Sequence, residues 1–171
     1  MDLILFLHIN FGGDILIELC KATHRDLPFI CQVCKSTEEI YSNIMPGAFS
    51  KQGKKYEKFG LPLDYDIHII KMDENPIGFL GLTQLKEDSV YLVALYLLKD
   101  FYRKNLGSST LDYLCSQLNQ KGINEIILQA HVDAYWAINF YKKNGFEEIV
   151  GDEQHIKNIV MKNTVIMRKN F

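Results

Sequence analysis

Apolar runs alternate along the chain with segments whose apolar positions recur every three or four residues, and this pattern predicts strands separated by helices. In the first hundred residues the β-rich runs are Ile15–Lys21, Ile67–Met72, Ile77–Leu85 and Val90–Leu98. Asp73–Pro76 has turn chemistry, so we expect a hairpin between the two runs that flank it. The unbroken apolarity of Val90–Leu98 is typical of a central strand that is covered on both faces.

Helical patterns lie between the first and second of these runs. A turn at Thr23–Pro28 leads into a helix that we expect to end near Lys35, and a second helix is predicted over Thr37–Asn43. Ser50–Gly60 carries four lysines and one acidic residue. This composition favours a solvated face or a mobile loop.

The second half of the chain alternates helix and strand. The predicted helices are Ser108–Lys121 and Ala134–Asn144, and the predicted strands are Glu125–Ala130, Phe146–Val150 and Ile159–Arg168. Asp133 is expected to cap the second of these helices and Gly145 to end it. Antiparallel strands followed by a βαβα order predict an α/β fold with a mixed central sheet and helices on both faces.

The length and composition fit one ordinary domain. A chain of 171 residues, 47% of them hydrophobic, can bury a substantial core but is short for two domains. We therefore expect residues 1–14 to be an N-terminal extension and residues 15–171 to form a single domain. Met1–Phe11 is apolar but too short to span a bilayer and has no leading Lys or Arg, which favours an edge strand or a short helix over a signal peptide.

Charge and cysteine content exclude several classes of function. A net charge of −2 provides no basic field, so we expect no nucleic-acid partner. We also expect no membrane partner, and a monomer or homodimer. The four cysteines do not suggest a disulfide framework, which favours a cytoplasmic location. Cys31 and Cys34 form a CxxC without a second ligand pair, so we expect no metal and interpret both as packing residues.

The segment that follows Val90–Leu98 has the composition of a phosphate-binding turn. The N–H groups at a helix N-terminus carry partial positive charge and favour phosphate. Within Tyr102–Ser109, Gly107 lets the backbone approach a ligand closely, while Arg103 and Lys104 can pair with phosphate oxygens. The alternative is an ordinary strand-to-helix loop with a capping serine.

Two patterns in the second half occur together in one known family. Ala134–Phe146 reads AYWAINFYKKNGF and matches Asn-x-x-Ala-x-x-Phe-Tyr-x-Lys-x-Gly-Phe at six places, with alanine at the Asn position. Before it, Tyr102, Asn105 and Gly107 align with the anchors of a Gln/Arg-x-x-Gly-x-Gly/Ala loop. These segments resemble the acetyl-coenzyme A site of the GNAT superfamily of N-acetyltransferases.

The resemblance implies a GNAT-like acyl-CoA N-acyltransferase fold. It also implies direct transfer of an acetyl group from acetyl-CoA, the co-substrate, to a primary amine of a small molecule or peptide. The residues expected to bind acetyl-CoA are Leu95, Tyr96, Leu97, Tyr102, Arg103, Lys104, Asn105, Leu106, Gly107, Ser108, Ala134 and Tyr141. Because Asn tolerates a left-handed backbone, Asn105 is expected to keep the turn. An N–H near Leu95–Leu97, freed where this strand splays from the next, would polarise the thioester carbonyl.

Two side chains are candidates for proton transfer in this scheme. Tyr141 would donate a proton to the departing thiolate, since a phenol has a reference pKa of about 10 and a thiol of about 8.5. Val90–Leu98 contains no acid that would take the proton of the amine. His131, just past a strand end, is the leading candidate base. Candidates by neighbourhood alone are Asp66, His68, Glu87 and Tyr91.

Other classes of function remain open from the sequence. A non-catalytic GNAT-fold module that binds acyl-coenzyme A or a partner is the main alternative, favoured by the departures at Tyr102, Asn105 and Ala134. A nucleotide-binding α/β domain is a third class, but the chain has no Gly-rich fingerprint or Walker sequence. In the family the acceptor is shaped by segments that correspond to Ser36–Leu63 and Gly151–Asn158, and neither carries a recognition code.

Overall fold

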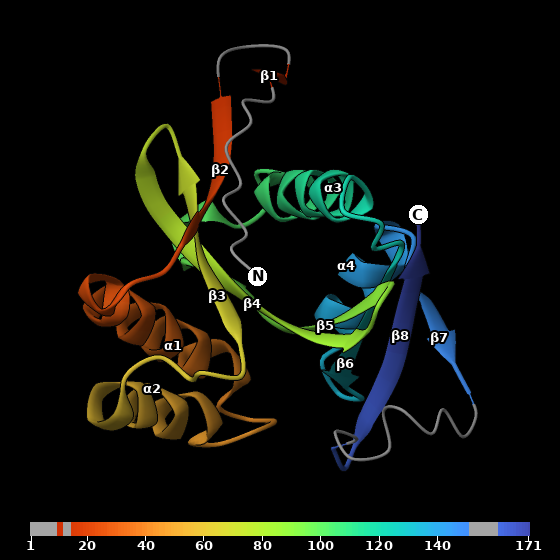
Figure 1. Ribbon diagram of the computed structural model, residues 1–171. Coiled ribbons are helices and arrows are strands. Elements are labelled where there is room, and N and C mark those ends of the chain that lie inside the picture. The colour runs from red at the N-terminus through yellow and green to blue at the C-terminus, as the bar shows by residue number, and fades with distance from the viewer. Residues whose placement is uncertain (1–9, 12–14, 151–160) are drawn as a thin grey trace.

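The computed structural model describes residues 10–11, 15–150 and 161–171, and in these the strands form one mixed sheet (Figure 1). The strands are β1 (Asn10–Phe11), β2 (Ile15–Lys21), β3 (Asp66–Met72), β4 (Asn75–Lys86), β5 (Ser89–Leu97), β6 (Glu125–His131), β7 (Glu147–Ile149) and β8 (Thr164–Asn170). Their order in the sheet is β1-β2-β3-β4-β5-β6-β8-β7. Only β5 and β6 pair in parallel, and the other described pairs are antiparallel. The predicted mixed α/β fold is confirmed.

Helices cover both faces of this sheet. The helices are α1 (Leu27–Tyr41), α2 (Ala48–Phe59), α3 (Leu106–Asn119) and α4 (Tyr135–Lys143), with 3-10 turns η1 (His24–Asp26) and η2 (Lys99–Phe101). Side chains of α1 and α2 pack on one face with Ile67 and Ile69, while α3 and α4 pack on the other with Ile70. The alternation along β3 follows the two-residue period of a strand. In the part of the chain that the structure describes, no helix is both long and apolar enough to cross a membrane.

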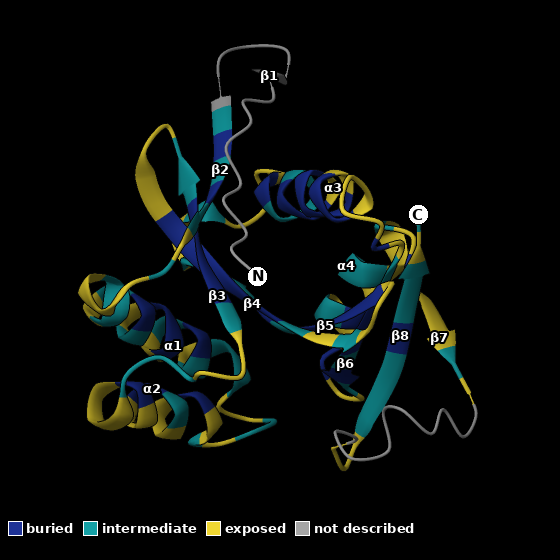
Figure 2. Ribbon diagram, viewed as in Figure 1, coloured by how far each residue is buried: buried dark blue, intermediate teal, exposed yellow. Residues whose placement is uncertain are grey.

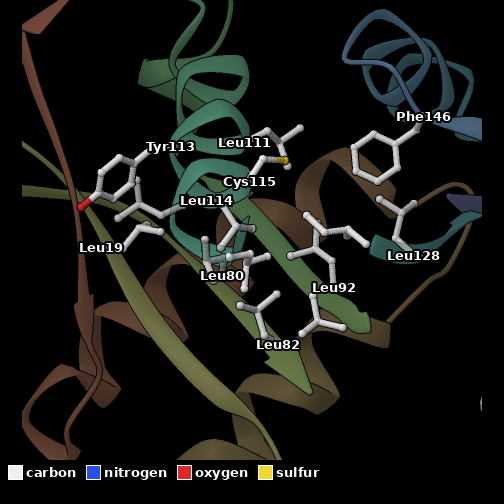
Figure 3. Close-up of a cluster of buried hydrophobic side chains, with 14 of the residues drawn as sticks. Leu19, Leu80, Leu82, Leu92, Leu111, Tyr113, Leu114, Cys115, Leu128 and Phe146 are labelled. Carbon is white, nitrogen blue, oxygen red and sulfur yellow. The ribbon is translucent and has the colours of Figure 1, made fainter. Parts of the chain in front are cut away.

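The larger core lies between the sheet and α3 (Figure 3). Leu111, Leu114 and Tyr113 of α3 are almost fully buried against strand residues such as Leu19 and Leu80. Dark blue in Figure 2 marks the same buried stripe along α3 and the central strands. The rigid part of the molecule is therefore the sheet with α3, and it fixes where the ends of β5 and β6 lie.

The predicted hairpin is confirmed, with a tighter turn than the sequence indicated. Asp73 and Glu74 both have positive φ angles, 49° and 67°, and they connect β3 to β4. Two successive left-handed residues match the twist of an antiparallel hairpin. Pro76 lies inside β4 and pairs with Lys71 at an irregularity in the register, which accommodates its missing N–H.

The prediction of two separate helices before residue 44 is wrong, because α1 runs without interruption to Tyr41. Thr37, the expected start of a second helix, is buried, and its hydroxyl donates to the Val33 carbonyl oxygen at 2.9 Å. The hydroxyl is thus satisfied inside one helix rather than capping another. The lysine-rich segment Ser50–Gly60 is also helical and forms most of α2. Phe49 and Tyr56 of this helix are buried, while its lysines are exposed. The predicted solvated face is therefore confirmed, and the alternative prediction of a mobile loop is wrong.

The predicted cap of the helix after β6 is also wrong. Ala134 holds the N-cap position of α4, with φ −85° and ψ 60°, and no side chain caps it. The carboxylate of Asp133 lies instead 3.6 Å from Nδ1 of His131. Gly145 ends the helix as expected, with φ 83°. In α3 the helix begins at Leu106, two residues earlier than predicted.

One sequence expectation falls largely outside the described residues, and another falls partly outside them. Of the extension 1–14, the structure describes Asn10 and Phe11, which pair with Leu16 and Ile15. The predicted final strand begins before residue 161, and β8 starts at Thr164. The division into an extension and one domain stays a prediction.

The carboxylate of Glu38 caps α2 from the neighbouring helix. It accepts the N–H groups of Gly47 at 2.6 Å, Phe49 at 3.0 Å and Ser50 at 3.0 Å. These groups lie at a helix N-terminus and lack partners within the helix. These hydrogen bonds lower the pKa of Glu38, and the bond from Ser50 has the largest effect. A depressed folded-state pKa means that this stabilisation is present at neutral pH and is lost as the pH falls through the folded pKa.

We expect Glu38→Gln to lower the free energy of unfolding at neutral pH by about 1 kcal/mol, because an uncharged amide has one acceptor oxygen for three N–H groups. The difference should shrink in acid, where the wild-type carboxylate is protonated. Denaturant unfolding at both pH values measures it. Glu39→Gln, at an exposed neighbouring position, is the control. Equal stability of the two variants at neutral pH would contradict the capping role.

Candidate active site

β5 and β6 diverge after a short parallel stretch. Among the described residues they pair only at Ser89 with Glu125, Val90 with Ile126 and Tyr91 with Ile127. β5 remains paired with β4 as far as Leu97, and a bulge near Val93 interrupts that register. Beyond Tyr91 the β6-facing backbone of β5 is therefore outside the parallel ladder, so its N–H groups are available to a ligand. The splay predicted around Leu95–Leu97 is confirmed.

Side chains tie the two strands together where they part. Nε2 of Gln129 donates to the Tyr91 hydroxyl at 3.2 Å, and Oε1 of Gln129 lies 2.8 Å from both the Met161 nitrogen and the Thr164 hydroxyl. Tyr91 is the last residue of β5 that pairs with β6, so this side-chain bond links the two strands where their ladder ends. Burial raises the pKa of Tyr91. A neutral phenol in this position supports the apex of the splay and is a poor base.

The turn that leads into α3 has the predicted left-handed geometry. Arg103 and Asn105 have φ angles of 59° and 61°. Asn105 is the N-cap of α3, and its carbonyl oxygen accepts the Ser109 N–H at 3.0 Å. The N–H groups of residues 106–108 precede that bond and lie at the open end of the helix. Because Arg103 and Lys104 are exposed beside them, this helix end suits a phosphate group.

Gly107 has a packing role in addition to the one expected from the sequence. A Cβ atom at this position would lie 3.1 Å from the ring of Phe140 in α4. The glycine therefore lets α3 approach α4 closely, and any larger residue would also shift that contact. Lys104 lies beside the same turn, with its Nζ 5.5 Å from the centre of the Phe101 ring.

Tyr141 lies on α4 within a group of aromatic rings. Its ring centroid is 5.1 Å from that of Phe140 and 5.3 Å from that of Phe146. Burial, followed by the nearby phenols of Tyr41 and Tyr91, raises its pKa. The phenol therefore keeps its proton at neutral pH, which is the state that a proton donor requires.

Tyr41, at the C-terminal end of α1, is a site residue that the sequence reasoning missed. Burial has the largest effect on the pKa of Tyr96, Tyr102 and Tyr141, and the nearby phenol of Tyr41 raises each of these pKa values further. Its ring lies 5.4 Å from that of Trp136, which is 47% exposed. No spacing in the sequence links α1 to α4, and only the fold brings these residues together.

His131, the last residue of β6, lies at the end where the strands have diverged. Its Nδ1 accepts the backbone N–H of Asp133 at 3.2 Å. A neutral imidazole whose Nδ1 lone pair is occupied carries its proton on Nε2. The free side of the ring then presents a donor rather than an acceptor.

The remaining predicted cofactor residues surround the splay at different depths. Leu95 and Leu97 belong to the core on the α3 face, while Tyr96 packs on the α1 face. Ala134 is fully buried at the start of α4. Tyr102 is 39% exposed, and burial raises its pKa to about 12.

Of the other candidate bases, Asp66 and Glu87 lie at the opposite end of the sheet. Asp66 begins β3 and is 3.4 Å from Lys21, and Glu87 follows β4 at the opposite end of β5. His68 is fully buried within β3. A cavity of about 400 Å³ lies at that opposite end, where Asp66 and Val90 help to line it. It therefore has no part in binding at the splay.

The CxxC cysteines lie on α1 as the packing interpretation requires. Cys34 is buried, and burial raises the pKa of its thiol to about 12. Burial also raises the pKa of Cys31, whose sulfur lies 3.6 Å from the Gly53 carbonyl oxygen. Thiols that stay protonated are weak nucleophiles and weak metal ligands.

Comparison with known sequences decides the family. Residues 34–146, which include the turn into α3 and the whole of α4, match the Acetyltransferase (GNAT) family. The chain belongs to this family. As a GNAT protein it is an acetyl-CoA-dependent acetyltransferase, and acetyl-CoA is its co-substrate. No curated protein matches the chain.

Solved structures share the fold of this GNAT chain along nearly its whole length. The PaiA N-acetyltransferase from Thermoplasma acidophilum, in complex with coenzyme A, has a TM-score of 0.73 and 26% identity over 91% of this chain and 99% of that one. An acetyltransferase from Thermus thermophilus has a TM-score of 0.70 and 12% identity over 96% and 100%. Tetrahymena GCN5 has a TM-score of 0.68 and 14% identity over 90% and 94%. The last two likenesses are evidence of the fold alone.

The left-handed turn before α3 can be tested without disturbing the Phe140 contact. We expect Asn105→Val to reduce the rise in melting temperature that excess acetyl-CoA produces, because a β-branched residue disfavours a φ of 61° and displaces the N–H groups that follow. Asn105→Gly, which allows the same backbone, should keep the rise. Thermal unfolding with and without acetyl-CoA measures both. An undiminished rise in Asn105→Val would separate this turn from the binding site.

Proposed function

We propose that this GNAT chain binds acetyl-CoA in the splay between β5 and β6 and passes the acetyl group directly to a primary amine. The observation that carries the proposal is the end of the parallel ladder at Tyr91, beside the left-handed turn at Asn105. The pyrophosphate would bind the N–H groups of residues 106–108, with Arg103 and Lys104 beside it. The thioester carbonyl would accept an N–H from Leu95–Leu97.

Tyr141 is the proton donor in the proposed reaction. The neutral amine attacks the thioester carbon, the C–S bond breaks, and the sulfur leaves with the bonding electron pair. The phenol of Tyr141 gives its proton to that sulfur and regains one, through water, from the ammonium that attack creates. Support comes from its place on α4 and from the aromatic packing that fixes its ring.

His131 is better placed to hold a hydrogen bond than to remove the proton of the amine. Its Nδ1 is engaged by the Asp133 N–H, which leaves Nε2 as a donor. β5 and α4 carry no carboxylate. We therefore propose that water takes the proton and that His131 orients a group at the mouth of the splay.

The alternative is a binding module without turnover. Of the three departures that favour it, Asn105 keeps the left-handed turn and Ala134 fills a buried position, so two are compatible with a working site. We also propose a cytoplasmic location, which the four free cysteines support, and a monomer or homodimer. Acetyl-CoA titration beside a turnover assay distinguishes enzyme from module.

Tyr141→Phe tests the proton donor. We expect kcat to fall by roughly 10²-fold with little change in acetyl-CoA affinity, because the phenolic proton acts mainly in the transition state. Thiol release with a panel of primary amines measures turnover. Tyr135→Phe, at an exposed position of the same helix, is the control. Unchanged turnover in Tyr141→Phe would make this tyrosine structural.

The pH profile tests how the amine loses its proton. If water removes it, kcat/KM should rise with pH towards the pKa of the amine, about 10.4 for a lysine-like acceptor, because only the neutral amine attacks. His131→Ala should lose activity modestly and keep the same profile. A collapse of activity, together with a wild-type inflection that disappears in His131→Ala, would instead establish His131 as the base.

A further inference from the structure

A row of ring contacts crosses from β5 to the helix that follows β6. The ring of Tyr96 in β5 lies 5.3 Å from that of Phe49, which lies 5.0 Å from that of Tyr41. The Tyr41 ring in turn lies 5.4 Å from that of Trp136, at an angle of 63°. Since α4 begins just beyond His131, the row spans the mouth of the splay.

The outer end of this row is open to a ligand. Trp136 is 47% exposed, although its ring packs edge-on against that of Tyr41. An exposed indole that is fixed in place offers an apolar surface at low entropic cost. Through Tyr41 and Phe49 the row connects this open face to Tyr96 of β5, the strand proposed to hold the thioester.

The charges around this row do not suit a polycation. The carboxylate of Glu38, one turn before Tyr41, already accepts three N–H groups at the start of α2. α4 contains two lysines and no acidic residue, and β5 contains no charged residue. Asp133 is exposed beside His131, and Lys51, Arg103 and Lys104 are exposed on the adjoining elements. Glu39 and Asp100 are exposed on α1 and η2.

We propose that Tyr41 and Trp136 form the wall on which the acceptor lies, and that this acceptor is a primary amine carried on an apolar or aromatic body. The inference rests on the proposed function.

The experiment compares 2-phenylethylamine with spermidine as acceptors. We expect kcat/KM for 2-phenylethylamine to exceed that for spermidine by about tenfold or more. Trp136→Ala should raise the KM for 2-phenylethylamine about tenfold, and Trp136→Phe should recover part of the loss. The acetyl-CoA-induced rise in melting temperature should stay unchanged in both variants. Tyr135→Ala, which removes the exposed neighbouring ring, is the matched control and should leave both KM values unchanged.

Each other outcome counts against a defined part of the inference. A preference for spermidine would overturn the acceptor class while leaving acetyl transfer standing. A Trp136→Ala variant with normal KM for 2-phenylethylamine, or with acetyl-CoA binding weakened to the same degree, would overturn the wall. No turnover of either amine, while other primary amines of the panel are acetylated, would overturn this inference alone. No turnover of any amine, while acetyl-CoA still raises the melting temperature, would overturn the proposed function and this inference together.

Discussion

The parallel pairing of β5 with β6 stops after three residue pairs, and the site depends on that interruption. A complete ladder would use the N–H groups of β5 within the sheet and leave none for a carbonyl oxygen. Antiparallel pairing with β4 and β8 holds the two strands on their other edges, so the splay costs little sheet structure. Gln129 of β6 hydrogen-bonds the hydroxyl of Tyr91 in β5 where the last pair ends.

The helices at this end of the sheet complete the site in complementary ways. α3 supplies free N–H groups and a partial positive charge, which suit an anionic ligand. α4 supplies the phenol of Tyr141, and α1 supplies the ring of Tyr41. Glu38 joins α1 to α2 by capping the second helix, and this holds Phe49 against Tyr41. The Glu38 carboxylate thus serves the scaffold.

The raised pKa values of the phenols have one main physical origin, which is burial. Burial takes Tyr41, Tyr96 and Tyr141 out of water, and the phenol of Tyr41 further disfavours ionisation of Tyr96 and Tyr141. All of them remain neutral at ordinary pH, so they can donate hydrogen bonds but cannot serve as bases. This constraint, together with the occupied Nδ1 of His131, makes water the simplest acceptor for the proton of the amine.

The sequence by itself determined the strands, the left-handed turn at Asn105 and the helix that carries Tyr141, because each depends on residues close together in the chain. It wrongly predicted a break within α1 and a cap for α4. The Thr37 hydroxyl bonds the Val33 carbonyl oxygen inside one helix, and the Asp133 carboxylate lies beside His131. Only the tertiary structure decided that Tyr41 meets Trp136. That contact joins helices separated by most of the chain, and no local pattern encodes the divergence of β5 and β6 that lets them meet.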